Sequence, residues 1–330
     1  MKSLNVLVTS GISDECQQTI TGVGPEVKMT NVSELFRAER RGDPAAKEKL
    51  DALLEEAEVV YGYRYPEDIL ARAPKLKWIE VMSAGVDRFL TNDMRKSRVM
   101  LINSSGIHAN TISEFVICTM LMFVKQSQSC FQMKQNKEWG RFNALVLRGK
   151  TVGIVGLGSI GREVARLAKA FGMRVLAIRR SARRIGHAKY VDIMLLPDKL
   201  QQLLTESDFV VLAVPFTGET EGLIGEQELR AMKPTAYLIN IARGAVVDED
   251  VLIRALEEHW IAGAGLDVFT TEPLPTDSKL WELPNVIFSP HVAGGMDDYA
   301  LRATEVFAGN LRRYLNGEKL INVVDKKKGY

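Results

Sequence analysis

The sequence has few cysteines, no long apolar run and no strong excess of charge of one sign. Its three cysteines, Cys16, Cys118 and Cys130, are odd in number and widely spaced along 330 residues. Such spacing predicts neither a disulfide framework nor a zinc site, and it fits a reducing cytoplasm. No uninterrupted apolar stretch approaches the roughly 20 residues that a membrane span needs. We therefore expect a cytoplasmic protein without a metal ion, a membrane segment or a signal peptide.

Charge is nearly balanced, with 43 Lys and Arg residues against 41 Asp and Glu residues and a formal net charge of +2. This balance gives no reason to expect nucleic acid or an anionic membrane as the main partner. Apolar residues make up 46% of the chain and charged residues 25%, which is typical of an ordinary globular protein. The length suggests two domains, each with its own hydrophobic core.

Short apolar strand candidates alternate with helical patterns along the whole chain. In the first third we expect strands at 5–8, 59–61, 78–81 and 100–102, and a long helix then follows from about Thr111 to Lys134. Further strands are expected at 151–155, 174–178, 209–214, 236–241, 263–268 and 286–288. The alternation predicts an α/β fold with two Rossmann-like, doubly wound parallel sheets. We expect a dinucleotide-binding domain, residues 106–292, inserted into a substrate domain formed by residues 1–105 and 293–330, with the ligand in the cleft between them.

A glycine-rich segment marks the expected nucleotide site. Gly156-Leu157-Gly158-Ser159-Ile160-Gly161 matches G-x-G-x-x-G, follows an expected strand and opens an expected helix. The first glycine permits a tight turn, the second lets the backbone approach a pyrophosphate, and the third lets helix pack closely on strand. The helix N-terminus would then hold the anion. A plain strand–helix turn without a ligand is the alternative, and the flanking elements argue against it.

The next strand end indicates which dinucleotide is bound. An NAD site usually has an acidic residue there, which binds the ribose 2′-hydroxyl. This chain has Arg179-Arg180-Ser181 instead, and no Asp or Glu occurs from Val164 through Val191. Arginine suits a 2′-phosphate because its planar group donates two hydrogen bonds to the anion. We therefore expect NADPH to be favoured, with NAD possible, although a solvated basic loop is the simpler alternative.

Three short segments downstream of the glycine loop contribute a cation, a carboxylate and an imidazole. They are Ile239–Gly244 with Arg243, Asp267–Pro273 with Glu272, and Ser289–Gly294 with His291. A guanidinium can bind a carboxylate with two hydrogen bonds, and an imidazole can exchange a proton near neutral pH. A carboxylate beside that imidazole fixes its tautomer. These are the groups needed to reduce a 2-keto acid with a hydride donor, although each residue alone could be a structural clamp, a turn residue or a loop residue.

Taken together and in this order, these segments resemble the D-isomer-specific 2-hydroxyacid dehydrogenase family, which includes glyoxylate/hydroxypyruvate reductases and phosphoglycerate dehydrogenases. The likeness covers nearly the whole chain and is strongest from Gly149 to Gly295. It implies two Rossmann-like domains with the cofactor domain inserted, and a homodimer with the long interdomain helix at its interface. It also implies an oxidoreductase that reduces a small 2-keto acid, such as glyoxylate or hydroxypyruvate, to the D-2-hydroxy acid with NAD(P)H.

The resemblance implies a role for each matched position. Arg243 would bind the substrate carboxylate and carbonyl, and His291 paired with Glu272 would be the general acid/base. The backbone N–H groups of Ser83-Ala84-Gly85 would hold the substrate carboxylate. Asp267 would contact the nicotinamide amide. The remaining positions implied near the cofactor are Val214, Pro215, Thr220 and Ile241.

The sequence departs from NAD-specific members at Arg179-Arg180. Because it ends shortly after the last expected helix, we expect no regulatory domain like that of many phosphoglycerate dehydrogenases. Glu272 argues against the formate dehydrogenases of the same superfamily. Two alternatives stay open. One is a phosphoglycerate-type dehydrogenase working oxidatively, for which Arg64 and Arg88 are the obvious additional cations. The other is a non-catalytic, corepressor-like protein that senses NAD(P).

Overall fold

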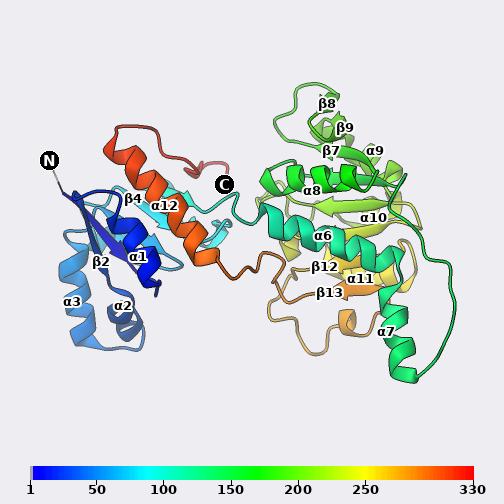
Figure 1. Ribbon diagram of the computed structural model, residues 1–330, viewed down its shortest axis with the longest axis horizontal. Helices are drawn as coiled ribbons and strands as arrows, with labels where there is room; N and C mark the ends of the chain where they lie inside the picture. Colours follow the sequence, from blue (N-terminus) through cyan, green and yellow to red (C-terminus); the bar gives the residue numbers. More distant parts are fainter. Residues whose placement is uncertain (1–2) are drawn as a thin grey trace. The chain divides into compact units, whose positions relative to one another are not determined.

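The computed structural model describes residues 3–330, which form two compact units. Unit 1 comprises residues 3–107 together with Met296–Tyr330, and unit 2 comprises His108–Gly295. Unit 2 is therefore inserted into unit 1 along the chain. Each unit contains a mostly parallel sheet with helices on its faces, so the predicted α/β class is confirmed (Figure 1).

Unit 1 contains a five-stranded parallel sheet in the order β2-β1-β3-β4-β5. The strands are β1 (Leu4–Val8), β2 (Val27–Asn31), β3 (Val59–Gly62), β4 (Trp78–Val81) and β5 (Met100–Asn103). The helices are α1 (Asp14–Thr21), α2 (Ser33–Glu39), α3 (Pro44–Leu54), α4 (Ile69–Arg72), α5 (Asn92–Lys96) and α12 (Tyr299–Leu315), with a 3₁₀ turn η1 (Asp87–Phe89). Strands β3 and β4 are buried along their whole length, because helices cover both faces of a parallel sheet.

Strand β2 was not predicted, because only its first residue is buried and the rest of Val27–Asn31 is largely polar. It is the edge strand of the sheet, where one-sided burial weakens the hydrophobic signal. Helix α3 begins with a strong local signal instead. Asp43 caps it by accepting hydrogen bonds from the backbone N–H groups of Ala45 and Ala46, and Pro44 occupies the first turn.

Helix α12 packs beside α1 on one face of this sheet (Figure 1). The rings of Tyr61 and Phe307 stack with centroids 4.1 Å apart, which joins β3 to α12. Glu80 lies fully buried in the middle of β4, and Asn310 of α12 donates to both carboxyl oxygens, at 3.2 and 3.1 Å. Burial raises the pKa of Glu80 to about 8, so its carboxyl group is mostly protonated at neutral pH.

Unit 2 contains an eight-stranded sheet in the order β13-β12-β11-β10-β6-β7-β9-β8. Among the described strands of this sheet, only β8 runs antiparallel to its neighbour, β9. The strands are β6 (Thr151–Val155), β7 (Arg174–Ile178), β8 (Gly186–Ala188), β9 (Val191–Leu195), β10 (Phe209–Leu212), β11 (Tyr237–Asn240), β12 (Gly263–Leu266) and β13 (Val286–Phe288). The helices are α6 (Ala109–Val124), α7 (Ser127–Asn136), α8 (Ser159–Ala170), α9 (Leu200–Glu206), α10 (Glu226–Ala231) and α11 (Glu249–Glu257). Short 3₁₀ turns are η2 (Pro197–Lys199), η3 (Gly244–Val246) and η4 (Lys279–Trp281).

The single long helix expected from about Thr111 to Lys134 is wrong, because the chain forms two helices there. Helix α6 packs beside α8, whereas α7 projects away from the sheet of its own unit (Figure 1). The break lies at Gln126, whose φ of 51° is left-handed and cannot continue a right-handed helix. Residues 125–129 are all polar and include neither glycine nor proline, so no typical helix-breaking residue marked the break in the sequence.

Candidate active site

The glycine loop Gly156–Gly161 joins β6 to α8 at the carboxyl end of the sheet of unit 2. Gly156 has a φ of 105°, and a Cβ there would lie 2.5 Å from the carbonyl oxygen of Ala213. A Cβ at Gly161 would lie 2.1 Å from the carbonyl oxygen of Gly156, so only glycine lets α8 approach β6 this closely. Gly158 is the N-cap residue and makes no side-chain cap bond, and its own Cβ position faces open space. The loop therefore fits a dinucleotide pyrophosphate at the start of α8.

Strands β7 and β10 flank β6, so their carboxyl ends lie beside the glycine loop. Arg179 and Arg180 follow β7 and are exposed, as is Ser181. Arg180 forms an ion pair with Glu219 at 3.3 Å, a contact that the sequence did not suggest. The loop after β10 is ordered by Thr220, whose hydroxyl donates to the carbonyl oxygen of Pro215 at 2.7 Å. Val214 is half-buried at the start of this loop.

Arg243 follows β11 and is held through its backbone. Asn240, the last residue of the strand, donates its side-chain N–H to the Arg243 carbonyl oxygen at 3.0 Å and accepts from the Ala242 N–H at 3.0 Å. The Arg243 guanidinium is half-buried and donates to the carbonyl oxygen of Ala242 at 2.7 Å. A Cβ at Gly244 would lie 1.9 Å from the carbonyl carbon of Phe269, so the segments after β11 and β12 are in close contact here.

Asp267 follows β12 and is 3% exposed. Its Oδ1 atom accepts three hydrogen bonds from the segment after β13: from the Ser289 hydroxyl at 2.5 Å, the Val292 N–H at 2.8 Å and the Ala293 N–H at 3.0 Å. Its carbonyl oxygen accepts from the N–H of His291 at 2.9 Å. We name residues 289–294 the histidine loop. Asp267 therefore fixes the histidine loop to the neighbouring strand end.

The other end of the histidine loop is held by His108. Its Nδ1 atom is 3.0 Å from the carbonyl oxygen of Gly294, and a Cβ at Gly294 would lie 2.9 Å from the same ring nitrogen. Burial lowers the pKa of His108, which favours the neutral ring, although the bond to Gly294 acts in the opposite direction.

The imidazole of His291 and the carboxylate of Glu272 are in contact. Nδ1 of His291 lies 2.8 Å from Oε2 of Glu272, and Oε1 of Glu272 accepts from the Phe269 N–H at 3.1 Å. Glu272 is thereby oriented by the backbone of its own segment. Within residues 3–330 no hydrogen bond engages Nε2 of His291, and the side chain is 48% exposed. A neutral or protonated imidazole held this way presents Nε2 to a ligand.

The three segments predicted to carry the chemistry follow β11, β12 and β13, which are neighbouring parallel strands. Their carboxyl ends therefore meet at one edge of the sheet, together with the cofactor candidates after β6, β7 and β10. The structure brings Glu272 and His291 into contact. Ile241 and Arg243 follow β11, which is separated from β13 by β12. The sequence analysis assigned no role to Asn240 and Ser289, which hold the Arg243 and His291 segments in place. A polar side chain at the end of a buried strand is the sequence feature that could have indicated this role.

Unit 1 contributes the remaining candidate, the loop Ser83-Ala84-Gly85 after β4. The Ser83 hydroxyl donates to the Gly85 carbonyl oxygen at 2.9 Å, and Asn103 donates to that of Ala84 at 2.8 Å. The carbonyl groups are thus engaged, whereas the N–H groups of Ala84, Gly85 and Val86 donate to no acceptor among residues 3–330. Adjacent free N–H groups can bind an anion.

Groups of histidine, cysteine and acidic residues arranged to hold a metal ion do not occur within residues 3–330. Over the same residues, no helix combines the length and the apolar character of a membrane span.

Comparisons with known proteins agree on one family. The family model described as "D-isomer specific 2-hydroxyacid dehydrogenase, NAD binding domain" matches residues 117–293. A glyoxylate reductase of Thermococcus litoralis is 35% identical over 327 residues, covering 93% of this chain and 96% of the relative. A glyoxylate reductase of Korarchaeum cryptofilum is 38% identical over 266 residues, covering 79% of each chain.

Two solved structures are similar over nearly the whole chain. A D-isomer specific 2-hydroxyacid dehydrogenase from Xanthobacter autotrophicus, in complex with NADPH and MES, has a TM-score of 0.84 at 28% identity and covers 99% of this chain and 100% of that one. An NADPH-dependent glyoxylate/hydroxypyruvate reductase from Sinorhizobium meliloti, in complex with NADP and sulfate, has a TM-score of 0.82 at 27% identity and the same coverage.

Proposed function

The chain belongs to the D-isomer-specific 2-hydroxyacid dehydrogenase family, and we propose that it reduces glyoxylate, hydroxypyruvate or a similarly small 2-keto acid to the D-2-hydroxy acid with NADPH. The observation that carries the proposal is the 2.8 Å contact between His291 and Glu272, with Nε2 of the imidazole open to a ligand. The sheet edge that holds this pair also holds the dinucleotide loop. The names of the relatives, glyoxylate reductase and NADPH-dependent glyoxylate/hydroxypyruvate reductase, support the substrate class.

In the proposed reaction, bound NADPH supplies a hydride to the carbonyl carbon of the keto acid. The electron pair of the carbonyl π bond moves to the oxygen, which takes a proton from Nε2 of His291. Glu272 holds the ring in the orientation that directs Nε2 to the substrate. Arg243 binds the substrate carboxylate and stabilises the charge that grows on the carbonyl oxygen. The loop Ser83-Ala84-Gly85, with the free N–H groups of Ala84 and Gly85, is a further candidate for binding a substrate carboxylate.

The cofactor assignments are part of the proposal. Gly156, Gly158 and Gly161, with Ser159 and Ile160 at the start of α8, would hold the pyrophosphate. Arg179, Arg180 and Ser181 would hold the 2′-phosphate. The residues that would line the rest of the cofactor site are Val214, Pro215, Thr220, Ile241 and Asp267. For Asp267 the three bonds to the histidine loop support a positioning role in addition to any contact with the nicotinamide amide.

His291→Asn tests the general acid. Asparagine tolerates the left-handed φ of 55° at this position, so the backbone should persist while the proton donor is lost. We expect the turnover number for NADPH oxidation with glyoxylate and hydroxypyruvate to fall about 10²–10⁴-fold, with NADPH affinity retained. His259→Asn is the matched control, because His259 is also left-handed and follows α11 outside the site.

Near-normal reduction by His291→Asn of every keto acid that the parent protein accepts would contradict the assignment. A parent protein that binds NADPH tightly but turns over none of these substrates would instead support a dinucleotide sensor.

The double variant Arg179→Ala, Arg180→Ala tests the phosphate contact. Charge-assisted hydrogen bonds contribute about 1.5–3 kcal/mol each, so we expect the KM for NADPH to rise at least about tenfold. The KM for NADH should stay nearly constant, because NADH lacks the 2′-phosphate. Steady-state kinetics with both cofactors measure this, and an equal rise in both KM values would refute the assignment.

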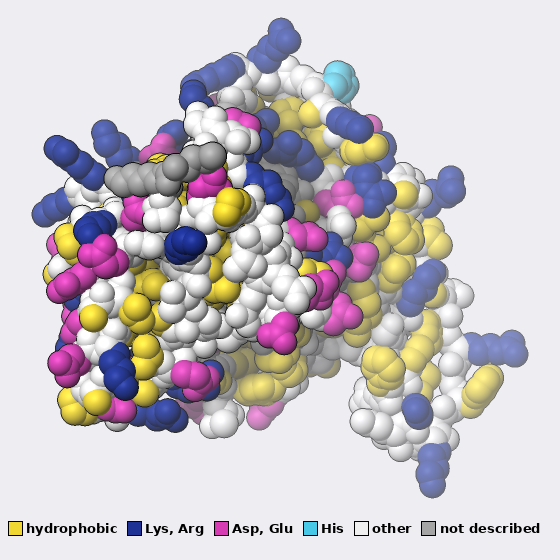
Figure 2. Space-filling model, turned by 60° about the vertical axis from the view of Figure 1, so that its left-hand side comes forward, with side chains coloured by type: hydrophobic (Ala, Val, Ile, Leu, Met, Phe, Trp, Pro, Cys, Tyr) yellow, Lys and Arg dark blue, Asp and Glu magenta, His cyan; other side chains and the backbone are white. Residues whose placement is uncertain are grey.

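We infer that the protein is a homodimer that associates through a projecting part of unit 2, the α7 arm, defined as α7 and residues 137–146. Helix α7 has no buried residue. Phe131 is 59% exposed, Trp139 93%, Leu145 52% and Val146 57%. Figure 2 shows hydrophobic side chains among basic ones on the projecting part at its lower right, where Figure 1 places α7. Several large apolar side chains exposed on one projecting part of a protein are typical of an interaction surface.

Sedimentation velocity tests the dimer. We expect the parent protein to sediment with twice the mass of one chain, and Phe131→Glu with Trp139→Glu to sediment as a monomer, because two charges would enter an apolar interface. Ile321→Glu, at an exposed apolar position of unit 1, is the control and should remain dimeric. A monomeric parent protein, or an arm variant that stays dimeric, would rule out this interface.

A cytoplasmic location is also proposed. Cys16, Cys118 and Cys130 are free, and the last two are exposed, which suits a reducing compartment. Cell fractionation that recovers the protein outside the cytoplasm with these thiols oxidised would contradict this location.

A further inference from the structure

An ion pair between Arg180 and Glu219 spans the carboxyl edge of the sheet of unit 2. The Nη1 atom of Arg180 lies 3.3 Å from Oε2 of Glu219. Arg180 follows β7, whereas Glu219 lies in the loop after β10. These two strands flank β6 on opposite sides. The pair therefore reaches across the carboxyl end of β6, where the glycine loop begins.

The loop that carries Glu219 is fixed through its backbone. The Thr217 N–H donates to the Thr220 hydroxyl oxygen at 2.8 Å, which closes a tight turn around Glu219. The Gly222 N–H donates to the Ala245 carbonyl oxygen at 2.8 Å, which joins the loop to η3. The Glu219 side chain itself is 75% exposed, so it can turn toward solvent while its backbone stays in place.

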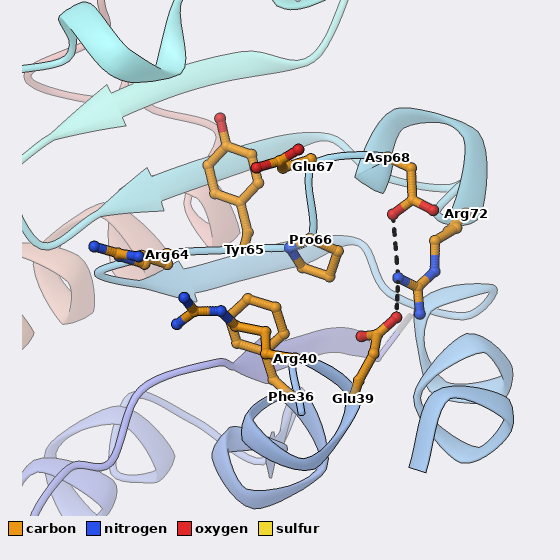
Figure 3. A pocket seen from close by; sticks show the side chains of 9 residues that line it. All are labelled: Phe36, Glu39, Arg40, Arg64, Tyr65, Pro66, Glu67, Asp68 and Arg72. Carbon is orange, nitrogen blue, oxygen red and sulfur yellow. Dashed lines mark hydrogen bonds and ion pairs between the residues drawn. The ribbon is translucent and has the colours of Figure 1, made fainter. Parts of the chain in front are cut away.

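An arginine of unit 1 shows how a more enclosed ion pair differs. Arg72 pairs with Glu39 and Asp68 at 2.8 and 3.1 Å, as the dashed lines in Figure 3 show, and its side chain is only 10% exposed. The side chains of Arg180 and Glu219 are 44% and 75% exposed. An exposed ion pair is weak because water and salt screen it. A stronger anion can therefore replace Glu219 at Arg180.

We propose that Glu219 is a specificity-determining residue that competes with the 2′-phosphate of NADPH for Arg180. The inference rests on the proposed function, in which Arg179 and Arg180 hold that phosphate. A phosphate monoester carries nearly two negative charges at neutral pH, and arginine matches its oxygen atoms with two hydrogen bonds. It therefore displaces the singly charged carboxylate. NADH has no 2′-phosphate, so it leaves the ion pair intact.

Two effects of Glu219 act against NADPH. The ion pair must open before Arg180 binds the phosphate, and the displaced carboxylate stays on the same fixed loop, where it repels the phosphate. Arg179 differs from Arg180, because among the described residues no ion pair or hydrogen bond engages its side chain. Only the contribution of Arg180 therefore depends on Glu219. The residue narrows the preference for NADPH over NADH.

Equilibrium binding of NADPH and NADH to Glu219→Gln, measured by titration calorimetry, tests this competition without relying on turnover. We expect the Kd for NADPH to fall about three- to tenfold at low ionic strength, because both the ion pair and the repulsion are lost. The Kd for NADH should stay within about 1.5-fold, since no phosphate reaches Arg180. The gain for NADPH should shrink at high ionic strength, because salt screens both effects.

Glu221→Gln is the matched control. Glu221 lies in the same loop and is exposed, and no ion pair or hydrogen bond engages its side chain within the described part of the chain. The variant removes the same charge, so the Kd for NADPH should change by less than about twofold. In an Arg180→Met background the gain from Glu219→Gln should be smaller, because only the repulsion remains.

The outcomes separate this proposal from the proposed cofactor site. If Arg180→Met weakens NADPH binding but Glu219→Gln does not tighten it, the competition is wrong and the phosphate site stands. If Arg180→Met leaves the Kd for NADPH unchanged, both are wrong. An equal gain from Glu221→Gln, or an equal gain from Glu219→Gln with and without Arg180, would also overturn the competition. So would weaker binding of both cofactors to Glu219→Gln, which would assign Glu219 to a part that NADPH and NADH share.

Discussion

The buried carboxylate of Asp267 connects the ends of two neighbouring strands, β12 and β13, through one oxygen atom that accepts three hydrogen bonds. This contact matters because His291 lies in the segment that it holds, in a left-handed conformation with a φ of 55°. Such a conformation persists when its surroundings determine it from several sides. Here the Asp267 carboxylate, the Asp267 carbonyl group and His108 together constrain the histidine loop. The distance between His291 and Glu272 depends on this loop.

Because most strands of unit 2 are parallel neighbours, the residues at their carboxyl ends lie at one edge of the sheet, where they can form a site together. Six consecutive neighbours of the sheet of unit 2 contribute residues at the same edge: β6, β7 and β10 to the proposed cofactor site, and β11, β12 and β13 to the proposed acid–base site. Helices cover both faces, so the edge is where polar side chains can meet a ligand.

Sequence patterns were sufficient where the signal is local. The glycine loop and its flanking strand and helix were predicted correctly, and the ordered motifs identified the family that the comparisons confirm. Strands β8 and β9 were not predicted, because they follow a basic segment with little apolar alternation. Helices α6 and α7 were predicted as one continuous helix. The bonds from Ser289 to Asp267 and from His108 to Gly294 join residues far apart in the chain, so no local pattern reveals them.

Single-turnover oxidation of NADPH by Asp267→Ala tests the central claim most directly, because it separates the rate of the chemical step from cofactor affinity. If Asp267 positions the histidine loop, the rate with glyoxylate falls about 10²–10⁴-fold, while the Kd for NADPH stays within about threefold. An unchanged rate would contradict the account. A weakened affinity for NADPH with the rate retained would contradict it as well, and would assign Asp267 to the cofactor alone.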